Sequence, residues 1–146
     1  STPIQLSINT GDAVVPEQAR AAAAGAEEPK YAMVYSTGER ILNLADPGAF
    51  RYLKIEAVIE FASDVNPEKV KDEAYKKAEE ELREYLAPRL PDIQDAITSV
   101  VTSKTVADVS AAQGKENLKE ELKSRLEPLI PDKIIRNIYF TQFVFQ

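Results

Sequence analysis

The segment that decides the fold is Lys133-Ile-Ile-Arg-Asn-Ile-Tyr-Phe-Thr-Gln-Phe-Val-Phe-Gln146, a run of β-branched and aromatic residues. Such residues favour strands, and apolar side chains occupy both sets of alternate positions. One set holds Ile135, Tyr139, Phe143 and Phe145, and the other holds Ile134, Ile138, Phe140 and Val144. A strand with two apolar faces is normally central or covered on both sides. We therefore predict a central or doubly covered strand whose aromatic residues are core, with a partner-binding patch as the alternative.

Two further stretches upstream predict strands. Tyr52–Ala62 alternates with period two and places Leu53, Ile55, Ala57, Ile59 and Phe61 on one face, as in a half-buried antiparallel strand. Before it, Ala32–Ser36 and Arg40–Leu44 flank Ser36-Thr-Gly-Glu39. This spacing predicts a hairpin in which Gly38 supplies a positive φ.

Three helices are expected between these strands and the last one. The first begins at the N-cap Asn66 and Pro67 and carries the stripe Val70, Ala74, Ala78, Leu82 and Leu86. The second presents Ile93, Ile97, Val100 and Val101. The third begins at a capping box, Ser110-Ala-Ala-Gln113, and carries Leu118, Leu122 and Leu126. Strands, helices and a final strand predict an α+β domain, an antiparallel or mixed sheet with three helices packed on it.

The chain divides into two parts of different composition. Residues 1–30 hold glycines, prolines and an alanine run but few large apolar groups, which predicts a flexible linker; a short helix near Glu17–Ala24 is the alternative. Residues 31–146 form the single folded domain. No apolar run approaches the roughly 20 residues that span a bilayer. The sequence starts at Ser1 without Met, so we expect a trimmed fragment and leave open whether a segment precedes it.

Composition argues against chemistry. With no His and no Cys, the usual general bases, thiolate nucleophiles and zinc ligands are missing, and the glycines are too far apart for a phosphate loop. We expect no catalytic residue, no cofactor and no metal ion. Asp92 and Asp95 lie three apart and are interpreted as acids that complement a helix N-terminus; a carboxylate-dependent hydrolase is the rival reading. A net charge of −6 with interleaved signs predicts no nucleic-acid partner.

Three stretches together resemble the flagellar basal-body-associated FliL family. They are Ile41–Asp46 with Arg51–Glu56; Leu90–Ile97 with Ser103-Lys-Thr105, Gly114-Lys115 and Leu118-Lys119; and Ile138–Gln146. The resemblance spans about Ile41 to Gln146. Gln94 departs from the family pattern, which often has Arg there. The membrane helix that the family carries near its N-terminus is absent, so residues 1–30 would be a juxtamembrane spacer.

The resemblance implies a non-enzymatic motor accessory protein on the periplasmic side of the bacterial inner membrane, at the flagellar basal body. Its fold would be similar to the stomatin-like (SPFH) domain. It would oligomerise into a ring around the stator complex, of the MotA/MotB or PomA/PomB type, and support stator activation and torque in swimming or swarming under load. A stomatin-like membrane scaffold without a motor role is the alternative.

A ring requires two complementary surfaces on each copy. The charged first helix could supply the acidic surface and the third helix the basic one. The candidate residues are Glu68, Glu80, Glu84, Lys119, Lys123 and Arg125.

Overall fold

The structure, a computed structural model, describes residues 29–48, 50–69 and 72–146. The expected linker and short helix within residues 1–28 lie outside the described part. In chain order the elements are β1 (Tyr31–Asn43), β2 (Tyr52–Ser63), the 3-10 turn η1 (Pro67–Lys69), α2 (Glu73–Leu86), η2 (Ala87–Arg89), α3 (Leu90–Val101), α4 (Val106–Ser110), α5 (Ala112–Leu126), η3 (Glu127–Leu129) and β3 (Ile135–Phe145).

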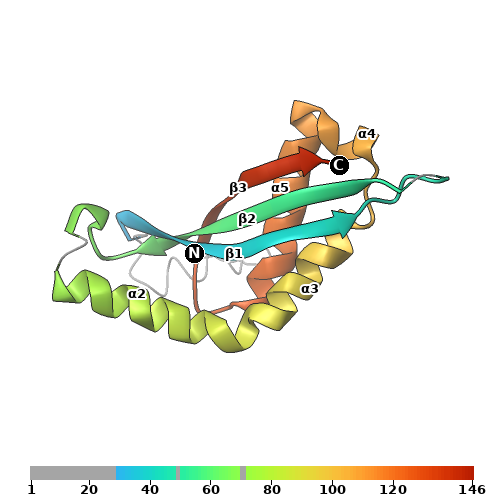
Figure 1. Cartoon of the computed structure of the whole chain (residues 1–146). Coiled ribbons are helices and arrows are strands. Elements are labelled where there is room, and N and C mark those ends of the chain that lie inside the picture. The colour runs from blue at the N-terminus through green and yellow to red at the C-terminus, as the bar shows by residue number, and fades with distance from the viewer. Residues whose placement is uncertain (1–28, 49, 70–71) are drawn as a thin grey trace, which may run out of the picture. The chain divides into compact units, whose positions relative to one another are not determined.

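The strands form one antiparallel sheet in the order β1-β2-β3, and the helices cover one of its faces (Figure 1). On that face α3 contacts β1 and α5 contacts β3. The central strand is β2, whose five alternating apolar residues are all at most 2% exposed. The α+β prediction with an antiparallel sheet is confirmed. The prediction that the last strand is central or doubly covered was wrong, because β3 forms an edge of the sheet and Tyr139 and Val144 on its outer face are exposed.

Two β-bulges decide which way the β3 side chains face. β3 advances two residues while β2 advances one, first between Ile135 and Asn137 and again between Phe140 and Gln142. Each extra residue reverses the alternation of side chains. The helix-facing side therefore receives Ile135, Ile138, Phe140, Phe143 and Phe145, which pair with the buried residues of β2. The expectation of two apolar faces was wrong. It assumed that side chains alternate without interruption along the strand, whereas each bulge shifts the alternation by one residue.

A third bulge lies where a hairpin was expected. β1 runs through Ser36–Glu39 without reversing, and both of its halves pair with β2. Gly38 has a φ of 97°, which favours glycine. Thr37 beside it is buried, and its hydroxyl donates to the carbonyl of Ala57 at 2.7 Å. The positive φ was predicted correctly, but it serves a bulge because β2 is long enough to pair with both halves.

The helix boundaries differ from the expected ones at two places. Asn66 accepts a hydrogen bond from the Glu68 amide and starts only the turn η1, whereas α2 begins at Glu73 after the N-cap Asp72. The expected capping box at Ser110 was also wrong, since Ser110 ends α4 and α5 starts after Ala111 without a side-chain cap. The described part thus has a short fourth helix, α4, which sequence patterning missed because five residues show no periodicity.

The core lies between the sheet and the helices. All four apolar residues expected to line the second helix are at most 2% exposed in α3, and the three leucines expected in the third are at most 1% exposed in α5. Of the stripe expected on the first helix, Leu82 and Leu86 are buried, whereas Ala74 is exposed. Ala78 is half-buried, and Val70, the first residue of the stripe, lies outside the described residues.

Candidate interaction surfaces

The structure places the six residues predicted for a protein-protein contact on three elements. Glu68 is exposed in η1 rather than on α2, so it is not part of the first helix. Glu80 and Glu84 are exposed on α2. On α5, Lys119 and Lys123 are half-buried and Arg125 is exposed.

These acidic and basic groups do not meet within the described part of one chain. Glu80 pairs locally with Arg83 at 3.6 Å, and Lys119 pairs with Glu116 at 3.4 Å. Both pairs join residues three apart on one helix, the spacing at which side chains on a helix surface are neighbours. Any contact between the two sets must therefore come from another copy, and it stays a prediction.

A hollow of about 470 Å³ lies where α5 passes β3, and its lining includes Lys115, Lys119, Phe140 and Phe143. The Lys115 Nζ lies 4.9 Å from the centre of the Phe143 ring, and the Lys119 Nζ lies 5.7 Å from that of Phe140. Cations over aromatic faces at such distances are attracted by the ring quadrupole. We call this hollow the α5–β3 groove. Sequence analysis gave the aromatic residues of this strand as an alternative partner-binding patch but missed the two lysines, although lysines spaced four apart on a helix signal a shared face.

The outer face of the sheet is a second surface that sequence analysis missed. Four of the five large apolar residues that are exposed in the described part of the chain lie there: Val34, Ile41, Tyr139 and Val144. They are interleaved with glutamates, and the Tyr139 hydroxyl donates to Glu60 at 2.5 Å. That hydrogen bond raises the pKa of Tyr139 above its usual 10.0. The register spreads them along this face, with Ile41 and Val144 both opposite Lys54, Tyr139 opposite Val58 and Val34 opposite Glu60.

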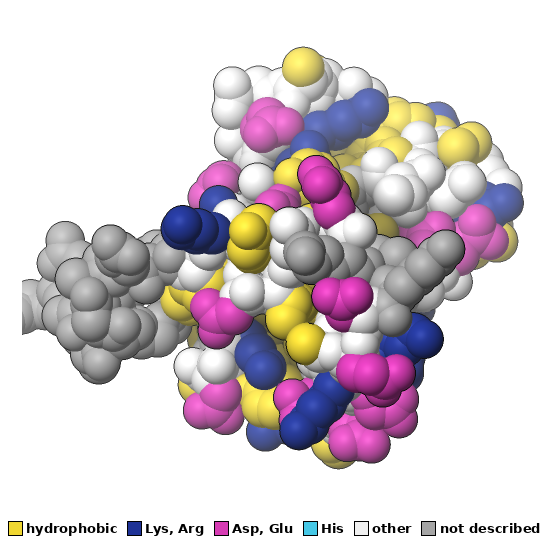
Figure 2. Space-filling model, turned by 90° about the vertical axis from the view of Figure 1, so that its left-hand side faces the viewer, with side chains coloured by type: hydrophobic (Ala, Val, Ile, Leu, Met, Phe, Trp, Pro, Cys, Tyr) yellow, Lys and Arg dark blue, Asp and Glu magenta, His cyan; other side chains and the backbone are white. Residues whose placement is uncertain are grey.

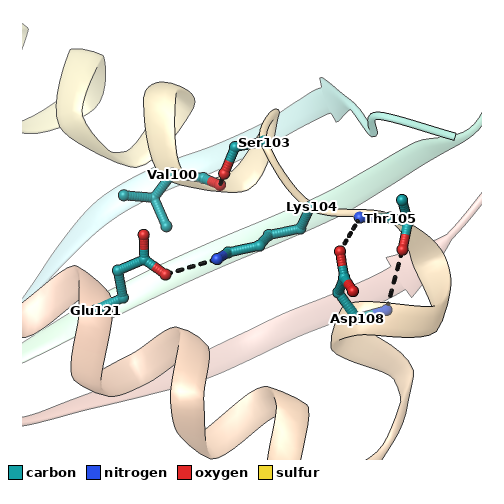
Figure 3. A network of polar contacts seen from close by, with 6 residues as sticks. All are labelled: Val100, Ser103, Lys104, Thr105, Asp108 and Glu121. Atoms are coloured by element: carbon teal, nitrogen blue, oxygen red, sulfur yellow. Dashed lines mark hydrogen bonds and ion pairs between the residues drawn. The ribbon is translucent and has the colours of Figure 1, made fainter.

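The loop between α3 and α4 ties together several distant parts of the chain (Figure 3). The Lys104 ammonium lies 2.7 Å from the Glu121 carboxylate of α5, and the Lys104 carbonyl accepts from the Ala45 amide at 2.8 Å. The Ser103 hydroxyl donates to the Val100 carbonyl at 2.7 Å. Ser103-Lys-Thr105, one of the stretches that carried the family resemblance, thus has a structural role.

A capping box at Thr105 starts α4. The Thr105 amide donates to the Asp108 carboxylate at 2.8 Å, and the Asp108 amide donates to the Thr105 hydroxyl at 3.2 Å. The Thr105 amide is the main cause of a pKa of Asp108 below its usual 3.8, and the Thr105 side chain adds to it. Thr105 is thus the N-cap of α4.

Gly114 allows α5 to approach α4 closely. A Cβ at this position would lie 2.0 Å from the Asp108 carbonyl oxygen, a distance that real side chains do not adopt. Only glycine therefore fits where the two helices meet. Gly114-Lys115 combines a glycine that packing requires with a lysine that lines the α5–β3 groove.

Gln94, the departure from the family pattern, joins α3 to the β1 bulge. The Gln94 side-chain amide donates to the Thr37 main-chain carbonyl at 3.2 Å. The Gln94 main-chain carbonyl accepts from the Arg40 guanidinium at 2.9 Å. Asp92 and Asp95 lie exposed on the same helix. General-acid carboxyl groups normally lie in water-poor sites, so this placement agrees with acids that complement a helix start.

Three further features concern the charge of the surface, metal binding and membrane crossing. Over the face that Figure 2 shows, acidic and basic side chains are interleaved. Among the described residues, no three acidic side chains are arranged to hold a metal ion. In the same residues, no helix is both long and apolar enough to cross a bilayer.

Comparison with known proteins identifies the family. Residues 34–146 match the family described as "Flagellar basal body-associated protein FliL". A relative named "Flagellar protein FliL", from Aquifex aeolicus (strain VF5), is 35% identical over 106 residues. That match covers 73% of this chain and 56% of the relative, so the chain spans about half the length of the curated relative. The chain belongs to the FliL family of flagellar basal body-associated proteins.

Proposed function

We propose that this chain is part of a non-enzymatic scaffold that oligomerises around the flagellar stator, at the periplasmic side of the inner membrane, and supports stator activity under load. The observation that carries the proposal is the match of residues 34–146 to a family named for the flagellar basal body. The apolar residues exposed on the outer face of the sheet are accessible to such a partner.

The scaffold would act by shifting an equilibrium of the stator between closed and open states. A bound partner shifts such an equilibrium only as far as it prefers one state. A ring that fits only the open stator would therefore raise the open fraction without any chemistry. We expect torque at high load to depend on it most.

Swimming speed as a function of medium viscosity tests this role. Cells that lack the gene should lose speed increasingly as viscosity rises, while the number of filaments per cell stays normal. Restoring the gene should restore the speed. Unchanged speed at every viscosity would contradict the motor role and favour a stomatin-like membrane scaffold.

For the ring contact we propose that Glu68, Glu80 and Glu84 of one copy face Lys119, Lys123 and Arg125 of the next. Charge composition supports this, since α2 has five glutamates against three basic residues and α5 has four basic residues against three glutamates. Because each copy would use two different patches, the contact is heterologous and can close a ring.

The absence of cysteine from the sequence makes this contact testable by crosslinking in cells. The whole protein carrying Glu84→Cys together with Lys123→Cys should form a ladder of disulfide-linked oligomers, and either single variant should give dimers at most. Lys123→Glu with Arg125→Glu should abolish assembly, and adding Glu80→Lys with Glu84→Lys should restore it. Assembly that persists through the charge reversal would exclude this pairing.

A further inference from the structure

Among the strands that the structure describes, none pairs with the outer edge of β3, which lies beside the α5–β3 groove. Tyr52 and Gln146 exchange both backbone hydrogen bonds, at 3.1 and 2.9 Å. In an antiparallel pair the next residues point their amides and carbonyls the opposite way. Phe143 and Phe145, which pair with β2 at the intervening positions, therefore direct their backbone groups away from the sheet. Unpaired groups of this kind are a template for another strand.

The groove is cationic above an aromatic floor. Phe140 and Phe143 have ring centres 5.1 Å apart, and Lys115 and Lys119 lie over them. Glu116 neutralises Lys119 in part, at 3.4 Å. Lys115 has no carboxylate at ion-pair distance among the residues that the structure describes. An acidic occupant would complement this charge.

The spacing of the two lysines matches an extended chain. Four residues of helix rise about 6 Å, and two residues of strand rise about 6.6–6.8 Å. Side chains two apart on a strand face the same side of the sheet. Carboxylates at alternate positions of an added strand would therefore meet Lys115 and Lys119 in turn.

We propose that β3 binds an extended acidic segment of a partner protein, which adds to the sheet as a further strand and directs alternate carboxylates to Lys115 and Lys119. Main-chain hydrogen bonds to Phe143 and Phe145 would supply affinity, and the lysines would select the acidic sequence. The inference goes beyond the proposed function, because it concerns binding by this domain and does not require the motor role.

Peptide titration with fluorescence anisotropy tests the proposal. The probe is the labelled peptide acetyl-Thr-Val-Thr-Glu-Thr-Glu-Thr-Val-amide. The control peptide, acetyl-Thr-Val-Thr-Glu-Glu-Thr-Thr-Val-amide, has the same composition but directs its glutamates to opposite faces of a strand. We expect the alternating peptide to bind about fivefold more tightly. Equal binding of both peptides, or no binding of the alternating one, would overturn strand addition with this specificity.

Charge-reversal variants locate the site. Lys115→Glu with Lys119→Glu should weaken binding of the alternating peptide about tenfold. The matched control, Lys76→Glu with Lys77→Glu on the exposed face of α2, should change it little, and circular dichroism should show both variants folded. Equal weakening by the two pairs would show general charge attraction and overturn the site.

Amide exchange separates a partner strand from other occupants. Bound peptide should slow hydrogen exchange of the Phe143 and Phe145 amides, and N-methylation of alternate peptide amides should abolish that effect. If the chain instead self-associates through this edge and the peptide fails to compete in sedimentation, the edge belongs to a second copy and the proposal is wrong.

Discussion

The Lys104 ammonium lies 2.7 Å from the Glu121 carboxylate and connects the loop after α3 to the middle of α5 (Figure 3). The main-chain carbonyl of Lys104 also accepts a hydrogen bond from the Ala45 amide. One side chain and its backbone thus join the end of β1, the α3–α4 loop and α5. The contact is partly shielded from water, since the two side chains are 27% and 40% exposed.

We predict that Lys104 and Glu121 are energetically coupled. In a double-mutant cycle with Lys104→Met and Glu121→Gln, urea unfolding should give a coupling of about 0.5–1 kcal/mol, because a short, partly shielded ion pair is screened less than an exposed one. The comparison pair Arg83 and Glu80, 3.6 Å apart and mostly exposed, should give less. Equal couplings would show that shielding does not matter here.

Gly114→Ala should destabilise the domain by about 2–3 kcal/mol, because the added methyl overlaps the Asp108 carbonyl and forces α4 and α5 apart. Gly48→Ala is the comparison, since its Cβ would meet nothing within 4 Å and only its φ of 72° opposes a side chain. That variant should lose roughly 1 kcal/mol. Similar losses at the two sites in urea unfolding would contradict the close approach of the helices.

The capping box at Thr105 should make the stability of the fold depend on pH in the acidic range. Hydrogen bonds from Thr105 lower the pKa of Asp108 in the folded chain, so the ionised carboxylate stabilises the fold above the unfolded value of about 3.8. That stabilisation is lost as pH falls through the lowered, folded pKa. The difference in melting temperature between the wild type and Asp108→Asn should therefore shrink on acidification. A difference that stays constant through this range would contradict the cap.

The Tyr139 hydroxyl should ionise at a higher pH than that of an ordinary tyrosine. Its hydroxyl donates to Glu60, which raises its pKa above 10.0, so the contact stabilises the fold below that pH. The stabilisation is lost as pH rises through the raised value. The ultraviolet absorbance difference between the wild type and Tyr139→Phe isolates one of the six tyrosines. Glu60→Gln should bring its titration back toward the ordinary value, and no response to Glu60→Gln would exclude that hydrogen bond as the cause.

Much of the fold follows from local patterns in the sequence. The period-two run of β2 predicted its buried face residue by residue, and the apolar spacing of α3 and α5 predicted their core residues. These predictions succeed because burial of one face imposes a period that the chain itself displays. Likewise, the ordered motifs from Ile41 to Gln146 were enough to indicate the family that the comparison then showed.

The orientation of β3 was decided by tertiary structure. A bulge depends on the pairing of two strands, so neither strand alone reveals it. Two bulges placed Phe140 and Phe143 on one face with the core and left Tyr139 on the other. Pairing with a long β2 likewise turned the expected hairpin at Gly38 into a bulge.

The α5–β3 groove could not be read from the sequence for the same reason. Lys115 and Lys119 share a face of α5 by their spacing alone, which local helix geometry determines. That they lie over Phe143 and Phe140, beside a strand edge that no described strand pairs with, depends on how α5 crosses the sheet. The sequence by itself determined which side chains are apolar and which share a face of a helix or an unbroken strand. Only the packing of helices against a bulged sheet decided which of these surfaces stay accessible to a partner, because accessibility depends on contacts between residues far apart in the chain.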